Sequence, residues 1–568
     1  MFGWLLLLLC FCGLGRVESA CPFASDLVPN ATVVGPVYCA GRDLQFSSVN
    51  LTITGYMEAT SLAISSPVGL LVYDSVWNIS GSVVVNSTGG GASLQNMTVS
   101  ALSFNMTGEG PQNGVLLRSV TFLGATSFNS LEITGNQTSG MGSGVELKQV
   151  EVRNVLRASF KGYSTCYGVS IHSSLVVENS TMEVIGKGQS VGVDFSSAVV
   201  QAYRSILSFN GEGVSSVPCD AAEGAGVRIA NSTIAGPQSC NFTFIGVHPK
   251  CGFCSSNFSV PCDHCHLEIN GFARTYGSPE NSTGVSLDGS ITASSLRING
   301  TGSACGARLG FSQSNGMDWH VNGYGAIGVE VLPKQTIIGQ IITILGFGSS
   351  DGIVIGESTS GDLYIASTRL EMRAVDSNFS INRNISLLLG NCSLRVDSEF
   401  SITFKPVVRL MNDGGIMTLF GRSTSTIFEV SGSSGFFNID GQFFVTQMVV
   451  SSPSFFGLIG TLSANSLSLP NSRCSFCGKI FVDTIFNAPE FLILCGSSSS
   501  PSVLLQSNSK VVLNSVYATI AGAQIAVHSP EIEFIGDVSR ENHLSELTHT
   551  YPDRQRSPKF IFCRGIES

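Results

Sequence analysis

Charged side chains are scarce in this sequence. Asp, Glu, Lys and Arg make up 12% of the 568 residues, about half the share found in typical soluble domains. The Lys and Arg residues form no cluster and the formal net charge is −10, which argues against binding to nucleic acid or to an anionic membrane surface. Almost no segment shows the 3.6-residue apolar spacing of an amphipathic helix. We therefore expect an all-β protein with no nucleic-acid partner.

Long hydrophobic runs are also missing, apart from one near the N-terminus. Residues 4–14 have the length of a signal-peptide core and are followed by Arg16 and by small residues suited to cleavage near residues 17–20. No later segment holds 18 uninterrupted apolar residues, and the C-terminus is polar rather than a hydrophobic lipid-anchor signal. We expect residues 1–20 to be a signal peptide with no transmembrane segment after it. The protein should then be secreted, extracellular or held at the cell surface.

Glycine, in contrast, is abundant, with 63 residues, and it marks a repeated motif. Motif A reads Gly, small apolar, variable, apolar, as in Gly144-Val-Glu-Leu. Its clear copies begin at Gly114, Gly144, Gly168, Gly192, Gly226, Gly284, Gly306, Gly328 and Gly352, with fainter copies at Gly69 and Gly91. Most copies lie 22–34 residues apart, and one step of 58 residues divides into 26 and 32 if Gly252-Phe-Cys-Ser is a degenerate copy. A repeat of this length predicts a solenoid.

A second motif lies between the copies of the first. Motif B alternates apolar and polar residues and ends in glycine, as in Leu131-Glu-Ile-Thr-Gly135 and Leu267-Glu-Ile-Asn-Gly271. Such alternation is typical of a strand with one buried face. We expect each repeat to hold at least two short strands separated by glycine turns, and stacked repeats to bury a column of Val, Ile, Leu and Phe.

The variable position of motif A carries residues of mixed polarity. These are Leu116, Glu146, Ser170, Asp194, Arg228, Ser286, Arg308, Glu330 and Val354. Because most of them are polar, we expect this position to form a mostly solvated face.

Coils of about 22–25 residues with short strands resemble the right-handed parallel β-helix of the pectin-lyase-like superfamily. That resemblance implies ladders of stacked asparagines in left-handed turns inside the helix. The Asn-Gly pairs at Asn210, Asn270, Asn299 and Asn322 fit such a ladder, which would place Asn299 inside and leave it without a sugar. The style of the repeats is also similar to that of secreted or surface β-helix proteins of protists, including the dispersed gene family surface proteins of trypanosomes.

The pattern of repeats suggests boundaries along the chain. After the signal peptide, residues 21–65 are expected to form an N-terminal cap and the first coil, because a bare terminal coil would expose a sheet edge. Residues 66–536 should form the β-helix, with a disulfide-rich insertion at about 240–266 and a more Phe-rich filling after residue 353. Residues 537–568 contain several His, Arg and Glu residues and two prolines, which predicts a polar tail or cap.

Asparagines that begin an Asn-x-Ser/Thr sequence are frequent, and they support a eukaryotic secretory route. They are 16 of the 24 asparagines up to residue 391, and none of the eight later asparagines has the pattern. Ser/Thr-rich turns produce some such sequences by accident, but the excess favours N-glycosylation. Besides Asn299, the candidates are Asn30, Asn50, Asn78, Asn86, Asn96, Asn105, Asn136, Asn179, Asn231, Asn241, Asn257, Asn281, Asn378, Asn384 and Asn391.

Fifteen cysteines remain after the signal peptide, so at least one is free or pairs between chains. Two Cys-x-x-Cys units with His264 and His266 beside them also fit zinc or, as Cys-x-x-Cys-His, haem, and one resembles a redox pair. A secreted protein favours disulfides instead. The disulfide candidates are Cys21, Cys39, Cys251, Cys254, Cys262, Cys265, Cys474 and Cys477. We expect cysteines to bridge neighbouring coils or fasten the long loops near residue 250.

Enzymes of the pectin-lyase-like superfamily carry acidic or basic clusters outside the solenoid. The Asp-Asp, Gly-His-Gly and Arg-Ile-Lys motifs of polygalacturonase-type hydrolases do not occur here. The eight histidines are scattered, so no Ser-His-Asp set can be argued. We assign no catalytic, cofactor-binding or metal-binding residue, although carboxylates on different coils can still assemble a site.

The sequence therefore favours a secreted, N-glycosylated, non-catalytic β-helix that presents an extended binding face to an extracellular glycan or protein. Two alternatives stay open. One is a polysaccharide lyase or glycoside hydrolase with a divergent site, and the other is a truncated member of a longer surface-protein family, which the odd cysteine would fit.

Overall fold

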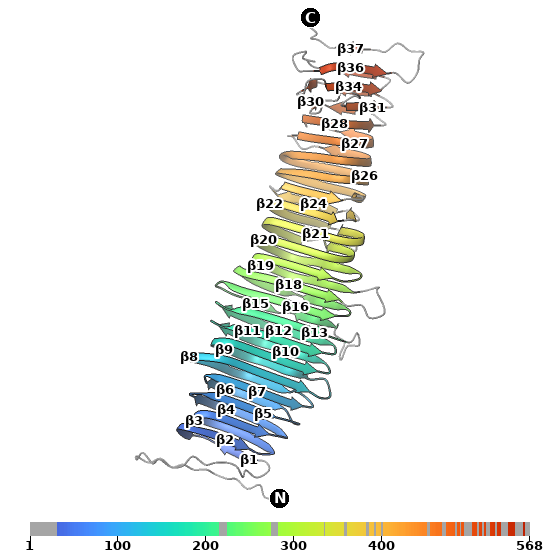
Figure 1. The fold of residues 1–568 in the computed structure, drawn as a ribbon. Coiled ribbons are helices and arrows are strands. Elements are labelled where there is room, and N and C mark those ends of the chain that lie inside the picture. Colours follow the sequence, from blue (N-terminus) through green and yellow to red (C-terminus); the bar gives the residue numbers. More distant parts are fainter. Residues whose placement is uncertain are drawn as a thin grey trace. The chain divides into compact units, whose positions relative to one another are not determined.

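The computed structural model of the chain describes residues 31–214, 224–273, 282–333, 335–356 and 361–375, and, beyond residue 375, the strands given below up to Phe562. Every regular element in these residues is a β-strand (Figure 1). The described residues include no helix long and apolar enough to cross a membrane. The chain divides into two compact units, Met1–Ala304 and Cys305–Ser568.

The first unit contains strands β1 to β19. Their bounds are Ala31–Val34 (β1), Val37–Ser47 (β2), Asn50–Ser66 (β3), Gly69–Ile79 (β4), Ser82–Ser87 (β5), Ala92–Ser100 (β6), Ser103–Gly110 (β7), Val115–Gln137 (β8), Ser143–Ser164 (β9), Tyr167–Glu178 (β10), Thr181–Gly188 (β11), Val191–Tyr203 (β12), Ile206–Gly213 (β13), Ala225–Ala230 (β14), Thr233–Ala235 (β15), Cys240–His248 (β16), Cys251–Ser256 (β17), Phe258–Ala273 (β18) and Thr283–Thr301 (β19).

The second unit contains β20 to β37. Their bounds are Cys305–Val331 (β20), Gln335–Ile355 (β21), Gly361–Val375 (β22), Asn378–Ile381 (β23), Ile385–Gly390 (β24), Ser393–Ser398 (β25), Ile402–Val450 (β26), Phe455–Ser468 (β27), Arg473–Val482 (β28), Phe486–Ala488 (β29), Glu490–Ile493 (β30), Val503–Ser507 (β31), Lys510–Leu513 (β32), Val516–Ala518 (β33), Ala523–His528 (β34), Glu531–Phe534 (β35), Leu544–Thr550 (β36) and Phe560–Phe562 (β37). Strands β36 and β37 pair with β34 and β35, so coil pairing reaches into the segment expected to be a tail or cap.

Successive repeats pair in parallel, and this makes each unit a β-solenoid. In the first unit Val145 pairs with Val169, and Val193 pairs with Val227. The register then continues from Val227 to Phe253, so Gly252-Phe-Cys-Ser is indeed a copy of motif A. The predictions of an all-β fold and of a stacked solenoid are confirmed.

The core is the column of apolar residues that motif A and motif B direct inward. Val145, Val169 and Val193 are completely buried. At the level of β12 to β16 the filling becomes aromatic, because the rings of Phe209 and Phe244 stack with centroids 5.1 Å apart. Burial of such a continuous column drives stacking of coils that could not bury their own apolar faces.

The repeated glycines serve close approach of two backbones. Gly186 of motif B lies within β11 and Gly192 of motif A lies within β12, and neither has a positive φ. A Cβ at Gly186 would overlap the carbonyl oxygen of Gly192, and the same relation holds for Gly162 with Gly168. The predicted glycine turns are therefore wrong at these positions: glycine is needed because any side chain would force the two strands apart.

Residues at two corners of the coil, not those of the Asn-Gly pairs, adopt the left-handed conformation. The non-glycine residues with positive φ are Asp74, Asn96, Ser119, Gln149, Ser173, Ser197, Asn231 and Asn257 at one corner, and Asn154, Asn179 and Arg204 at the other. Neighbouring members form hydrogen-bonded ladders at the surface, since Asn179 Nδ2 donates to Asn154 Oδ1 at 3.0 Å and Asn257 Nδ2 to Asn231 Oδ1 at 3.1 Å.

The predicted internal asparagine ladder is wrong. Asn210, Asn270, Asn299 and Asn322 lie within strands, are partly exposed and have no positive φ. Alternation along motif B directs the residue before its glycine outward, opposite to the buried column. One pair does stack, because Asn299 Nδ2 donates to Asn270 Oδ1 at 2.8 Å, but this contact lies on the outside.

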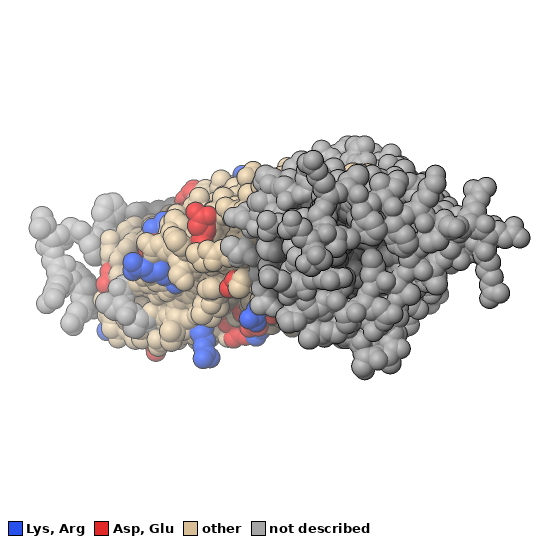
Figure 2. Space-filling view, turned by 90° about the horizontal axis from the view of Figure 1, so that it is seen from above, with Lys and Arg blue, Asp and Glu red and all other residues tan. Residues whose placement is uncertain are grey.

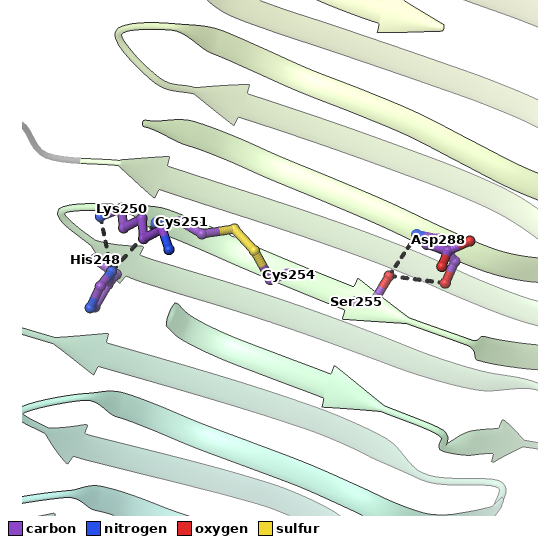
Figure 3. Close-up of a disulfide and its surroundings, with 6 residues drawn as sticks. All are labelled: His248, Lys250, Cys251, Cys254, Ser255 and Asp288. Carbon is purple, nitrogen blue, oxygen red and sulfur yellow. Dashed lines mark hydrogen bonds between the residues drawn. A yellow bond between two sulfur atoms is a disulfide. The ribbon is translucent and has the colours of Figure 1, made fainter. Parts of the chain in front are cut away.

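Two disulfides close the Cys-x-x-Cys units Cys251–Cys254 and Cys262–Cys265. Each lies within one strand, so the expectation that these cysteines bridge neighbouring coils is wrong for both pairs. Beside the first pair, the backbone amide of Lys250 donates to Nδ1 of the buried His248 at 2.9 Å (Figure 3).

The remaining disulfide candidates are less fully described. Cys39 is also disulfide-bonded. Cys21 lies outside the described residues, and Cys474 and Cys477 lie in β28, whose side chains are not described.

Candidate functional site

The variable position of motif A forms one continuous row on the outside of the first unit. Strand register places the following residues side by side: Thr32, Thr52, Leu71, Ser93, Leu116, Glu146, Ser170, Asp194 and Arg228. Neighbouring strands lie about 4.8 Å apart, so the eight steps of this row extend over about 38 Å. We call this surface the motif A face.

Two cavities lie along the motif A face and together form a groove. The first, of about 530 Å³, is lined by the row from Thr32 to Leu116. The second, of about 540 Å³, is lined by the row from Glu146 to Arg228. Both are also lined by Gln112 and Asn113, so the two cavities meet at the loop that carries these residues.

Two loops form the rim of the second cavity, and side-chain hydrogen bonds fix them. Asn113 Nδ2 donates to Glu146 Oε2 at 2.9 Å, and its Oδ1 accepts the amide of Ser143 at 2.9 Å. The buried Gln137 donates to the carbonyl of Pro111 at 3.1 Å and accepts from the hydroxyl of Ser164 at 2.8 Å. The rim is therefore tied to three coils.

Below this rim, Asp194 and Arg228 on adjacent coils form an ion pair. Arg228 Nε lies 2.6 Å from Asp194 Oδ1, and the side chains are only 17% and 4% exposed. The hydroxyl of Ser196 donates to the other carboxylate oxygen at 2.7 Å, and the guanidinium lies over the Tyr167 ring, 5.5 Å from its centroid. Burial alone would lower the pKa of Arg228, but the hydrogen bond and the charge of Asp194 raise it above its ordinary value.

The second carboxylate of the cavity, Glu146, lies two coils away from Asp194. Lys148 Nζ approaches Glu146 Oε1 to 2.6 Å, and His172 Nε2 lies 3.9 Å from the same oxygen. Between the two carboxylates, the buried hydroxyl of Ser170 is hydrogen-bonded to that of Ser143 at 2.6 Å. Two strand spacings separate the backbones at Glu146 and Asp194 by about 9.6 Å.

The expectation of a mostly solvated face is wrong for this row. Ser170 and Asp194 are 2% and 3% exposed, and Glu330 and Val354 of the second unit are likewise buried. Glu330 is paired with Arg308, so both units pair a buried acid with an arginine at this position. The two acids can stay buried because each is paired with an arginine of a neighbouring coil.

A second outward row runs beside the first, two residues further along each strand. It contains Tyr73, Gln95, Arg118, Lys148 and His172 in register. Tyr73 and Arg118 are exposed, so this row forms a polar border to the groove. On the face drawn in Figure 2, the acidic and basic side chains shown in colour are intermixed and lie among uncharged residues.

The predicted glycosylation sites lie mostly away from the groove. The exposed ones in the first unit are Asn50, Asn78, Asn86, Asn96, Asn105, Asn136, Asn179, Asn231, Asn241 and Asn257, and Asn299 is partly exposed. Of these eleven, only Asn50 lines either cavity. Asn30, Asn281, Asn384 and Asn391 lie outside the described residues, and the side chain of Asn378 is not described.

The sequence predicted the row formed by the variable position of motif A, but it did not predict the rim loops and the ion pair that shape the groove. Asn113 and Gln137 lie outside both motifs, in segments of irregular length, and nothing in their sequence context marks them as rim residues. Asp194 and Arg228 are 34 positions apart in the sequence, so no local motif reveals that they pair.

Comparison with protein-family models, with curated proteins and with solved structures found no match. The arguments for function therefore come from the geometry of the chain itself.

Proposed function

We propose that this chain is a secreted, N-glycosylated, non-catalytic protein that binds a linear polysaccharide along the groove of the motif A face. Its solenoid would be a right-handed β-helix of the pectin-lyase-like kind, with coils of the length that the repeats predict. The observation that carries the proposal is the pair of cavities that meet at Gln112 and Asn113 along one row of residues.

The composition of the groove favours a glycan over a protein partner. Its lining is dominated by glycine and by hydroxyl and amide side chains, among them Thr52, Ser93 and Asn113. Protein interfaces, by contrast, concentrate aromatic residues and Met at their core. Hydrogen-bonding groups distributed along such a row suit a polymer that presents hydroxyl groups at regular intervals.

The distribution of the glycosylation candidates supports the same face. Sugars on nearly all of the described candidate asparagines would cover other faces and corners of the first unit and leave the groove open. Only a sugar on Asn50 would border it, at the N-terminal end.

A glycoside hydrolase is the second candidate, because two carboxylates line one cavity. Two strand spacings separate the backbones at Glu146 and Asp194 by about 9.6 Å, which allows their carboxyl groups to reach the separation of about 6.5–9.5 Å found in inverting enzymes. However, Lys148 and Arg228 each neutralise one of these carboxylates. Asn113 and Ser196 occupy the second oxygen of Glu146 and of Asp194, respectively, so neither carboxyl group is free to face a scissile bond. Binding without cleavage is therefore the better-supported function.

The test compares two variants of the mature protein made in a secretory host. Leu71→Arg fills the groove at a 37% exposed position, and Val84→Arg places the same side chain at a 49% exposed strand position away from both cavities. On a panel of neutral and acidic linear polysaccharides, we expect Leu71→Arg to weaken retention at least tenfold and Val84→Arg to leave it unchanged.

Other results would change the conclusion. Failure of the unmodified protein to be retained by any polysaccharide would refute glycan binding and leave a protein partner. New reducing ends that disappear in Glu146→Gln and Asp194→Asn would establish the hydrolase.

A further inference from the structure

Three cysteine sulfurs converge on one glycine in the first unit. An ideal Cβ at Gly236 would lie 2.9 Å from Cys265 Sγ, 3.2 Å from Cys262 Sγ and 3.3 Å from Cys240 Sγ. Cys262 and Cys265 form a disulfide, whereas Cys240 is a free thiol, and all three are buried. A thiol therefore lies close to a disulfide inside the solenoid, in a space that exists because residue 236 has no side chain.

From this arrangement we propose that Cys240, Cys262 and Cys265 form a thiol–disulfide exchange centre. In it, Cys240 replaces Cys262 as the partner of Cys265. The Cys240 thiolate attacks Cys265 Sγ, the new sulfur–sulfur bond forms as the Cys262–Cys265 bond breaks, and Cys262 leaves as a thiolate that takes up the proton given up by Cys240. No external oxidant is required, because one thiol and one disulfide are present before and after the step.

Strand register identifies Cys265 as the sulfur that is attacked. Cys240 of β16 is the direct register partner of Cys265 of β18. Adjacent strands place such partners about 4.8 Å apart, within the Cα separation that disulfides adopt. The register of β18 shifts between Cys262 and His266, so the backbone at the attacked cysteine is already irregular.

The carbonyl of Gly236 identifies Cys262 as the leaving group. Its oxygen lies 2.8 Å from Cys262 Sγ but 3.7 Å from Cys265 Sγ. Once released and protonated, Cys262 has an acceptor in place for its thiol hydrogen. Among the described residues no group of three or more His, Cys, Asp or Glu side chains is arranged to hold a metal, so the chemistry of the cluster is that of thiol and disulfide.

Exchange changes what the disulfide connects. The Cys262–Cys265 bond closes a segment within one strand, whereas a Cys240–Cys265 bond joins two neighbouring coils. A bridge between more distant residues restrains the unfolded chain more strongly. The exchange therefore converts a local closure into a fastening between coils.

Counting free thiols in denaturant, by alkylation and mass spectrometry of the secreted protein, tests the proposal. In Cys262→Ser, we expect one thiol fewer than in the unmodified protein, because Cys240 pairs with Cys265. The control Cys254→Ser removes one member of the other pair and should give one thiol more, because Cys251 loses its partner.

The outcomes are distinct. A peptide joining Cys240 to Cys265 in Cys262→Ser would support the proposal, and so would the appearance of the same peptide in the unmodified protein after incubation with a trace of small thiol. One additional thiol in Cys262→Ser, as in the control, would refute it. A decrease in Cys265→Ser alone would refute the assigned order of attack, because Cys240 would then pair with Cys262.

Discussion

The ion pair between Asp194 and Arg228 gives the sharpest prediction about stability in the groove. Both side chains are largely buried, and each is the other's counter-charge. Replacing either by alanine leaves the remaining charge without its partner, whereas replacing both removes the two charges together. We therefore expect the losses of unfolding free energy in the two single variants to add up to more than the loss in the double variant.

The structure also predicts how the two single substitutions differ. Arg228→Ala leaves a carboxylate that is only 4% exposed and keeps the hydrogen bond from the Ser196 hydroxyl, so we expect a loss of about 4–5 kcal/mol. Asp194→Ala leaves a guanidinium that is 17% exposed and lies over Tyr167. That group can reach water more easily, so the loss should be nearer 3 kcal/mol. The coupling energy in the double-mutant cycle should be about 2–3 kcal/mol.

Native-state hydrogen exchange is the appropriate assay, because a long solenoid need not unfold in a single step. Peptides that cover β10, β12 and β14 report the free energy of opening of these coils, and peptides from β3 and β4 serve as an internal control. Additive single effects, with a coupling energy near zero, would show that the pair is screened by water and would refute the reasoning. A larger loss in Asp194→Ala than in Arg228→Ala would refute the argument from exposure.

Two further predictions concern the backbone contacts and the surface. Gly186→Ala should lower the secretion yield and reduce the stability by about 3 kcal/mol, because the added Cβ overlaps the carbonyl of Gly192. The control Gly69→Ala should be tolerated, because its Cβ would meet nothing closer than 3.5 Å. Equal thermal midpoints for the two variants would contradict this prediction. The hydrogen bond from Lys161 to Glu132 raises the pKa of Lys161. The bond therefore contributes to the stability of the fold, by less than about 1 kcal/mol, at pH values below the ordinary lysine pKa, and this contribution is lost as the pH rises through the pKa of the folded state. An NMR titration of the Lys161 ammonium should show this pKa fall in Glu132→Gln, and an unchanged value would refute the assigned cause.

The fold could be predicted from the sequence because both motifs are local. The alternation in motif B fixes which residues point inward, and the spacing of motif A fixes the coil length, so even the degenerate copy at Gly252 was identified correctly. The role of the glycines was not predictable in the same way. The contact between Gly186 and Gly192 is a property of the closed coil, and a glycine needed for close approach looks the same in sequence as one needed for a turn.

The candidate site was predicted less well, because it depends on neighbours in different coils. Asp194 was interpreted as solvent-exposed, since nothing near it in the chain indicates that Arg228 lies beside it. Asn270 and Asn299 were expected to stack inside, and they do stack, but on the outer surface. Adjacency across coils depends on the exact length of each loop, and those lengths vary from one repeat to the next.

The regular pairing of the motif A strands has a consequence for how recognition can change. Backbone hydrogen bonds, which are the same whatever the side chains, set the distance from one position of the row to the next. Each position from Thr32 to Leu116 can therefore be exchanged without altering the spacing of the others. If the groove binds a polymer as proposed, a substitution in one coil would change the contact with one unit of that polymer and leave the contacts of the other coils in place.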